Sequence, residues 1–242
     1  MSGPKLLIVG ECSGRIRQAM RKRGIDARSC DLKSAEDGEQ VYHYQGDIFH
    51  FLPKTPWMWD LDGLIAHPVC KRLTNAGSLH LYIGRRKVNG IDPEKWADME
   101  AGAEAYLAMK AIPAKRKAIE NPIMHKHAAK MIGKRADQFV QPWWFGDPFF
   151  KATGWDLDGF PKLKPTNKLV PPKPGTDEHK AWSKVFRMAP GPEREADRSR
   201  TEPGHAEAIA DQWGGILLAG HGLETEAGMQ VMPCTIQEYQ PA

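Results

Sequence analysis

Two reactive side chains in this sequence each follow a short apolar segment, in the pattern of a strand that ends at the edge of a parallel sheet. Cys70 ends the stretch that begins at Leu64, and Glu120 comes fifty positions later, directly after Ala118 and Ile119. Open α/β sheets hold their ligands at the carboxyl ends of their strands, so a thiol and a carboxyl group there would face one substrate. This pairing of a nucleophile with an acid predicts covalent catalysis.

Each of these side chains also has a purely structural interpretation. Cysteine is often a small buried hydrophobic residue, and Glu120 with the Asn-Pro that follows it could cap a helix. The sequence around Cys70 favours reactivity, because Lys71 and Arg72 follow it and positive charges stabilise a thiolate. At Glu120, a carboxyl group at a sheet edge can hydrogen-bond or protonate a ring nitrogen.

A glycine turn follows the first apolar segment of the chain. Gly10 and Gly14 bracket this turn, which lies between a predicted strand and a predicted helix, the context of a nucleotide-binding turn. Glycines let the backbone approach a ligand, and a helix amino terminus offers free N–H groups. The turn lacks the Lys of a Walker loop and the third glycine of a dinucleotide fingerprint, so a plain tight turn remains equally open.

Two acidic residues stand at the ends of the next predicted strands. Asp31 lies about 20 residues past the first strand, where a carboxylate can accept hydrogen bonds from ribose hydroxyls. Asp47 ends a third segment in the same way. Either could be a solvated strand-end acid, but together with the glycine turn they fit an adenosine-bearing cofactor laid across successive strand ends.

Length and composition indicate a soluble globular protein. The chain has 242 residues, 41% of them hydrophobic and 26% charged, with a net charge of +4. No apolar run approaches the roughly 20 residues of a membrane span, and the amino terminus lacks a signal-peptide pattern, so we expect a cytoplasmic protein. Four widely spaced cysteines predict reduced thiols and no metal site. The mild positive charge permits a polyanionic partner without requiring one.

The elements that would position these residues alternate between strands and helices. Predicted strands cover residues 5–9, 27–30, 41–44, 62–66 and 117–119. A helix after the glycine turn has an apolar side and basic residues largely outside it, including Arg17, and Gly24 ends it. A crossover helix precedes the last strand, with apolar residues at helical spacing: Trp96, Met99, Ala103, Tyr106 and Leu107. This alternation predicts a doubly wound parallel sheet, an α/β fold.

The pattern changes after about residue 140. Residues 141–200 are rich in proline, lysine and aromatic residues, which predicts a small irregular region or a long loop over a ligand. A final helix is expected at 205–213, ended by Gly214 and Gly215, and the tail from 216 to 242 could add a strand or two. We therefore divide the chain into a core of residues 1–140, an irregular region of 141–200, and a helix and tail of 201–242.

Taken together, these motifs resemble the DNA cytosine C5-methyltransferases, in particular the short versions found in phages and prophages. The resemblance rests on the glycine turn, Pro68-Val69-Cys70, Glu120-Asn121-Pro122, Lys151-Ala152-Thr153 and the carboxyl-terminal helix, and it covers roughly residues 5 to 215. It implies a Rossmann-like S-adenosylmethionine-dependent methyltransferase sheet, with residues 141–200 as a target-recognition region. It also implies double-stranded DNA as substrate, and we expect a monomer.

The resemblance implies a role for each matching residue. Cys70 would add to C6 of a flipped-out cytosine, Glu120 would hold and protonate N3, and Asn121 would fix the loop that presents Cys70. Lys151 stands where the family usually has an arginine and could contact the base carbonyl. S-adenosylmethionine would lie against a set of strand-end and loop residues: Gly10, Glu11, Gly14, Asp31, Asp47, Ile48, Pro68 and His205.

Departures from the family pattern leave alternatives open. His67-Pro68-Val69-Cys70 replaces the usual proline pair, and Gly204-His205 stands where the family commonly has Gly-Asn. His205 could be a simple cap, or it could mark an altered donor such as carboxy-S-adenosylmethionine, whose carboxylate needs a cationic or donor group. An RNA cytosine methyltransferase and an inactive DNA-binding relative are further alternatives.

Two more clusters have two interpretations each. Trp143 and Trp144 could be core residues, or one of them could line a base pocket or stack on nucleic acid. A basic series could contact DNA phosphates or form a solvated helix face: Lys126, Lys130, Lys134 and Arg135.

Overall fold

Seven strands form one sheet in the order β3-β2-β1-β4-β5-β7-β6. The computed structural model describes residues 3–69, 73–74, 81–121, 123–189 and 191–230. The strands are β1 (Lys5–Val9), β2 (Asp26–Asp31), β3 (His43–Gln45), β4 (Gly63–Ala66), β5 (Lys117–Glu120), β6 (Gln138–Val140) and β7 (Thr153–Asp158). Among these seven strands, β7 alone runs in the direction opposite to the other six. This is a mostly parallel, Rossmann-like sheet, and the predicted α/β fold is confirmed.

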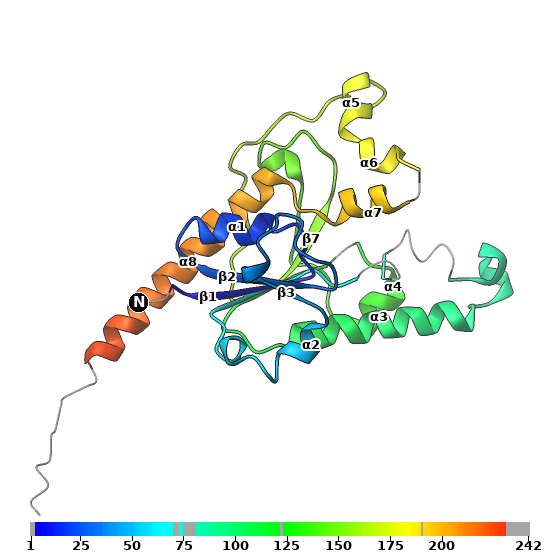
Figure 1. Ribbon diagram of the computed structural model, residues 1–242. Helices are drawn as coiled ribbons and strands as arrows, with labels where there is room; N and C mark the ends of the chain where they lie inside the picture. The colour runs from blue at the N-terminus through cyan, green and yellow to red at the C-terminus, as the bar shows by residue number, and fades with distance from the viewer. Residues whose placement is uncertain (1–2, 70–72, 75–80, 122, 190, 231–242) are drawn as a thin grey trace, which may run out of the picture.

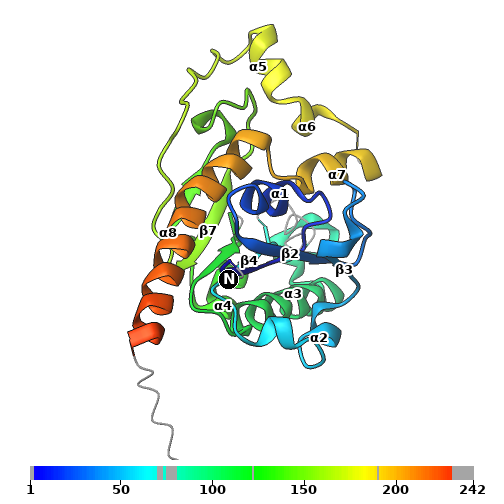
Figure 2. The ribbon, with the colours of Figure 1, turned by 60° about the vertical axis from the view of Figure 1, so that its left-hand side comes forward.

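Helices cover both faces of the sheet (Figures 1 and 2). On one face lie α1 (Arg15–Arg21) and α8 (Pro203–Gln230); on the other lie α2 (Ile48–Phe51), α3 (Pro93–Ala111) and α4 (Lys126–Ile132). Along β1 the side chains alternate between two apolar cores. Leu6 and Ile8 pack in the core with α1 and α8, whereas Leu7 and Val9 pack in the core with α3 and α4. Because both faces are covered, β1 is almost continuously apolar.

Shorter elements fill the connections. Among the described residues, these include the 3-10 turns η1 (Gln40–Tyr42), η2 (Pro56–Trp59), η4 (Ile83–Arg85), η5 (Lys87–Asn89) and η6 (Pro142–Trp144). After the last strand, α5 (Asp177–Trp182), α6 (Lys184–Arg187) and α7 (Pro192–Ser199) form a group that stands away from the sheet on the side of α1 (Figures 1 and 2). No helix among the described residues is long and apolar enough to cross a membrane.

The crossover helix α3 forms where the sequence predicts it. Asp92 caps its amino terminus by accepting hydrogen bonds from the backbone N–H groups of Glu94 and Lys95. Its buried residues, Met99, Ala103 and Tyr106, follow the spacing of one helix face. Leu107 was expected on this face but is 40% exposed, because it lies one position beyond Tyr106 and points away from the core stripe.

The last helix is longer than predicted. The sequence favours an end at Gly214 and Gly215, and possible strands after 216, but α8 continues to Gln230. A glycine inside a helix costs only about 1 kcal/mol, which tertiary packing can offset. A Cβ at Gly214 would lie 2.9 Å from Ile25 Cδ1 and 3.2 Å from Met20 Sδ. A side chain at Gly214 would therefore push α8 away from α1, which contains Met20, and from Ile25.

Two other expectations need correction. Strand β7 lies inside 141–200 and pairs with both β5 and β6, so the irregular part of that region is residues 159–200 and the sheet extends past residue 140. Arg17 is not on the outer face of α1. It is fully buried, hydrogen-bonded through Nη1 to Ser29 Oγ at 2.5 Å and ion-paired through Nη2 with Asp37, because this partner lets a guanidinium enter the interior.

Candidate functional site

The candidate site lies at the sheet edge where the parallel strands end. Residues that follow β1, β2, β3, β4 and β5 meet there, as parallel strands require. Strand β7 begins at this edge because it runs in the opposite direction, and its first residue Thr153 pairs with Val140 at the end of β6. The sheet therefore brings Lys151, two residues before β7, to the same edge as Glu120.

Glu120 is paired with a histidine from the neighbouring strand end. His67 directly follows β4, and its Nδ1 lies 2.7 Å from Glu120 Oε2. Burial raises the pKa of the Glu120 carboxyl, but the hydrogen bond and charge of His67, with Lys151 and His205, bring that pKa below its ordinary value. Glu120 is thus an ionised carboxylate near neutral pH, held by an imidazole.

The His67 side chain is fixed on several sides. It is 10% exposed, and its ring meets Trp155 edge-on at a centroid distance of 5.7 Å. Its backbone N–H continues the β1–β4 ladder by donating to Val9 O at 2.8 Å. Its second ring nitrogen, Nε2, is buried and has no hydrogen-bond partner among the described residues. Glu120 therefore makes the contact that orients this imidazole and sets its tautomer.

His205 and Lys151 complete the cluster from two other elements. His205, in the first turn of α8, is 2% exposed, stacks on Phe145 at 4.9 Å and meets Trp155 at 6.0 Å. Burial and the nearby charge of Lys151 lower the pKa of His205 to about 3, so it is neutral near pH 7. Its backbone N–H, like that of Gly204, donates to the Asp147 carboxylate at 3.2 Å.

Lys151 is a mostly buried ammonium. Its Nζ donates to Arg200 O at 2.5 Å and lies 3.9 Å from Glu202 Oε1. Burial lowers the pKa of Lys151, and the charges of Glu120 and Glu202 oppose that shift. A cation of this kind can hydrogen-bond a carbonyl or an anion placed beside Glu120.

The glycine turn is tied to this cluster by direct contact. Gly10 has φ +77°, and a Cβ there would lie only 2.4 Å from His67 O, so the turn after β1 packs against the end of β4. Glu11 is buried and accepts hydrogen bonds from the N–H groups of Ile16 (2.7 Å) and Arg17 (3.3 Å). Burial raises the pKa of Glu11, with these bonds and the His67 charge opposing.

Glu11 thus changes the expectation for this turn. Free N–H groups were expected at the start of α1, but the Glu11 carboxylate occupies two of them. Gly14 has φ +70°, and a Cβ there would lie 2.0 Å from Asp37 Oδ2. A side chain at this position would therefore displace Asp37 from its ion pair with Arg17. The role of Gly10, Glu11 and Gly14 in cofactor binding stays a prediction.

The remaining predicted cofactor residues lie along the same edge. Asp31 ends β2 and accepts from Lys33 N at 2.9 Å, while exposed Asp47 caps α2 by accepting from Phe49 N at 2.9 Å. Ile48 is 3% exposed and packs in the core under β3, and Pro68 is buried directly after His67. The strand ends bring these residues to one edge, and their contact with a cofactor is untested.

Asn121 follows Glu120 directly and is buried beside it. Asn121 is 1% exposed, and its N–H donates to Gly154 O at 2.9 Å, which carries the β5–β7 ladder one residue past Glu120. It also lines a cavity of about 190 Å³ with Arg135 and Phe139. Cys70 lies outside the described residues, so its predicted role as nucleophile rests on the sequence.

Trp143, Trp144 and Lys134 have contacts within the protein, and the nucleic-acid contacts of these two clusters stay a prediction. Trp144 packs partly buried against the core of α1 and α8, and Lys168 lies 5.7 Å from the Trp143 ring centroid. Lys134 pairs with Asp137 at 2.7 Å and with buried Asp156 at 2.5 Å, which ties it to the core rather than leaving it for phosphate.

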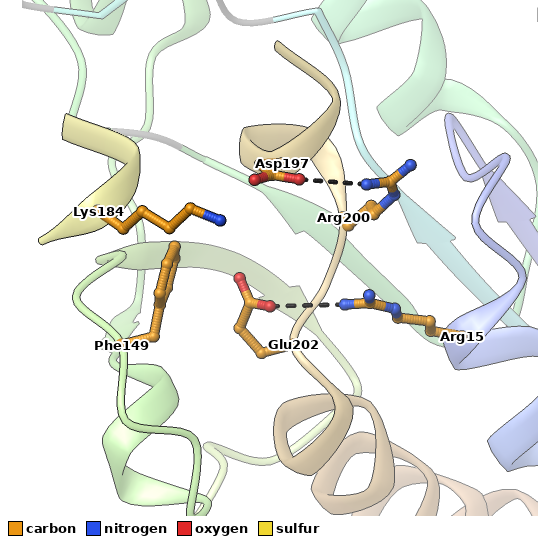
Figure 3. A pocket seen from close by; sticks show the side chains of 6 residues that line it. All are labelled: Arg15, Phe149, Lys184, Asp197, Arg200 and Glu202. Carbon is orange, nitrogen blue, oxygen red and sulfur yellow. Dashed lines mark hydrogen bonds and ion pairs between the residues drawn. The ribbon is translucent and has the colours of Figure 1, made fainter. Parts of the chain in front are cut away.

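A charged pocket of about 170 Å³ adjoins the cluster (Figure 3). Figure 3 shows Arg15 beside Glu202, 3.5 Å apart, and Arg200 beside Asp197, 3.2 Å apart, with Phe149 and Lys184 on the other wall. Glu202 connects this pocket to the site, because it also faces Lys151. Lys151 in turn acts electrostatically on Glu120.

His67 is the site residue that the sequence interpretation missed. Its signal was present in the text: a polar residue directly after a buried strand, three positions before a candidate nucleophile. As part of a motif that departs from the family pattern, His67 had no predicted function. Only the β4–β5 pairing, which sets Ala66 opposite Ile119, shows that His67 and Glu120 are neighbours.

Comparisons with known proteins add one distant similarity. No family profile matches the sequence, and no curated protein matches it. Among solved structures, one similar chain is described as a "putative DNA modification methyltransferase" encoded within a prophage of E. coli. The two share 14% identity and a TM-score of 0.40 over 64% of this chain. The match spans 46% of that protein, less than half of its length.

Proposed function

We propose that this protein is a DNA cytosine C5-methyltransferase. The observation that carries the proposal is the His67–Glu120 pair, whose side chains lie 2.7 Å apart at the ends of the adjacent strands β4 and β5. Cys70 follows His67 by three residues in the sequence. A thiol and an ionisable carboxyl group at neighbouring strand ends suit addition to a pyrimidine ring. An enzyme that methylates an exocyclic amino group has no need of that thiol.

The chain's own residues divide the work of this reaction. The Cys70 sulfur forms a bond to C6 of a flipped-out cytosine, while Glu120 holds N3 and gives it a proton. Asn121 would fix the loop that presents Cys70, and its own backbone is held against β7 by the bond from its N–H to Gly154 O. The Lys151 ammonium lies close enough to influence Glu120 and can donate to the base carbonyl.

S-adenosylmethionine, when bound, supplies an electrophilic methyl group for C5 of the ring. The strand-end carboxylate of Asp31 suits ribose hydroxyls, and the close packing of Gly10 on His67 sets the turn beside the catalytic pair. Asp47, Ile48 and Pro68 would border the same ligand. Glu11 would act by holding the start of α1 in place, since its carboxylate is bound to that helix.

Residues 159–200 are the proposed target-recognition region. They contain ten Lys and Arg against five Asp and Glu, a net charge of +5 where the whole chain has +4. The positive charge is thus concentrated here, and exposed side chains carry it: Lys162, Lys164, Lys168, Lys173, Lys180, Lys184 and Arg187. Such a surface suits the phosphates of double-stranded DNA.

We propose S-adenosylmethionine itself as the methyl donor. A donor that carries an extra carboxylate would need a cation or a hydrogen-bond donor beside it. His205 offers no cation near pH 7, because burial and the charge of Lys151 lower its pKa to about 3.

Trapping with a suicide base tests this function. Incubation with S-adenosylmethionine and duplex DNA containing 5-fluorocytosine is expected to give a covalent protein–DNA adduct, because fluorine cannot leave C5 as a proton does. Cys70→Ser should abolish the adduct, and Glu120→Gln should slow it. A matched RNA duplex is expected to give none. An adduct on RNA alone, or no adduct from folded wild-type protein that binds S-adenosylmethionine, would contradict the proposal.

A further inference from the structure

The environment of Glu120 conflicts with the role that the proposed reaction gives it. As Cys70 adds to C6, negative charge develops on the ring, and Glu120 must provide N3 with a proton. The contacts of Glu120 instead hold its carboxyl group ionised, although burial alone would do the opposite. The proton must therefore come from a group bound to this carboxylate.

We propose that His67 is the positioning residue that supplies this proton through Glu120. The inference rests on the proposed function. His67 Nδ1 lies 2.7 Å from Glu120 Oε2, close enough for the two groups to share one proton. An imidazole is suited to this task because it changes charge near neutral pH, unlike an ordinary carboxyl group.

The proton and the electrons balance within the pair, the base and the thiolate. The pair starts with one shared proton, as an imidazolium and a carboxylate. As the Cys70 thiolate forms the sulfur–C6 bond, the C5=C6 π bond breaks and its electron pair moves through C4 to N3, which takes the proton from the Glu120 carboxyl; His67 is left neutral and Glu120 ionised. After methyl transfer to C5, loss of the C5 proton re-forms the C5=C6 bond, the sulfur leaves C6 as a thiolate, and N3 returns its proton to the pair.

The charged groups around the pair are consistent with this sharing. Glu11, from the turn after β1, interacts electrostatically with His67 and favours its positive form. Lys151, before β7, and His205, at the start of α8, both face Glu120; Lys151 is cationic and His205 is neutral. The Trp155 ring contacts both imidazoles edge-on, His67 at 5.7 Å and His205 at 6.0 Å between ring centroids.

His67→Asn separates proton supply from simple positioning. The asparagine amide can still donate to Glu120 where Nδ1 did, but it cannot titrate. Rates of adduct formation on 5-fluorocytosine DNA should be measured from pH 5.5 to 9, with His67→Gln as a second variant. His50→Asn is the control, because His50 is exposed and outside the site.

For wild type and His50→Asn we expect a bell-shaped profile whose falling limb belongs to the His67–Glu120 pair. For His67→Asn we expect a loss of at least about tenfold near pH 7.5, part of the ~10²–10⁴-fold that general acid catalysis supplies. Its falling limb should move to lower pH, since Glu120 must then bind the proton alone. An equal loss at every pH, or a wild-type profile in His67→Asn, would overturn the inference.

A measurement on variants with intact His67 covers the case in which both His67 variants unfold. Histidine ring ¹⁵N signals would be followed by NMR in wild type and Glu120→Gln, and the His67 titration midpoint should fall in Glu120→Gln. An unchanged midpoint would overturn the inference. Adduct formation by the wild-type protein distinguishes failure of the proposed function from failure of this inference. If wild type forms no adduct, the proposed function fails; if it does, the experiment tests only the role of His67.

Discussion

Gly10→Ala is expected to damage the site through a backbone contact rather than through a side chain. Gly10 has φ +77°, where a non-glycine residue costs about 1–2 kcal/mol. Its Cβ would also lie 2.4 Å from His67 O and 3.3 Å from His67 Cβ, neither of which can rotate away. Overpacking of this kind adds about 1–3 kcal/mol, so the free energy of unfolding should fall by about 2–5 kcal/mol in total.

Gly24→Ala is the matched control. Gly24 has φ +86°, but a Cβ there would meet no atom within 4 Å, so only the backbone cost of about 1–2 kcal/mol applies. Both variants would be compared with wild type by urea unfolding followed by tryptophan fluorescence. Gly10→Ala should also lose adduct formation, because His67 must move, whereas Gly24→Ala should keep it. Losses within about 0.5 kcal/mol of each other, with adduct formation intact, would refute this reasoning.

Two further predictions concern buried charge. Asp156→Asn should lower the free energy of unfolding by about 2–3 kcal/mol. This is less than the ~3–5 kcal/mol lost when a fully buried ion pair is broken, because Lys110 and Lys134 still reach solvent. Urea unfolding measures the loss, with exposed Asp177→Asn as a near-neutral control, and equal losses in the two variants would contradict the prediction. For His205, the folded pKa of about 3 lies below the ordinary 6.5, so the unfolded chain binds the extra proton and stability falls as pH drops below about 6.5. At pH 5 this amounts to about 2 kcal/mol, and His205→Gln should remove that part of the pH dependence; an identical pH dependence in wild type and variant would contradict it.

The parallel strands β1 to β5 were predictable because they carry their signal locally, whereas β6 and the antiparallel β7 were not predicted. Buried parallel strands are continuous apolar runs, and residues 5–9, 62–66 and 117–119 stand out against charged surroundings. The end of α8 was not predictable in the same way. Gly214 reads as a helix end, and only its packing against Met20 and Ile25 explains why the helix continues. Burial of Arg17 likewise depends on Asp37, a partner twenty positions away.

The candidate site was predictable in its types of residue but not in its contacts. Glu120 follows from sequence position, since it ends a predicted strand. Lys151 was named only from the family resemblance, and the antiparallel strand β7 that follows it was not predicted. The pairing of His67 with Glu120 joins residues 53 positions apart and depends on the order of the strands in the sheet. The hydrogen bonds from the amino terminus of α1 to the Glu11 carboxylate could not be predicted either, because no local sequence pattern indicates which groups that carboxylate binds.

The central claim is that this protein methylates C5 of cytosine in DNA. The most direct measurement is mass spectrometry of nucleosides from duplex DNA incubated with the protein and S-adenosylmethionine whose methyl group carries deuterium. We expect labelled 5-methyldeoxycytidine from wild-type protein and none from Cys70→Ser. A label on an amino group of cytosine or adenine, or a labelled product that persists in Cys70→Ser, would contradict the account.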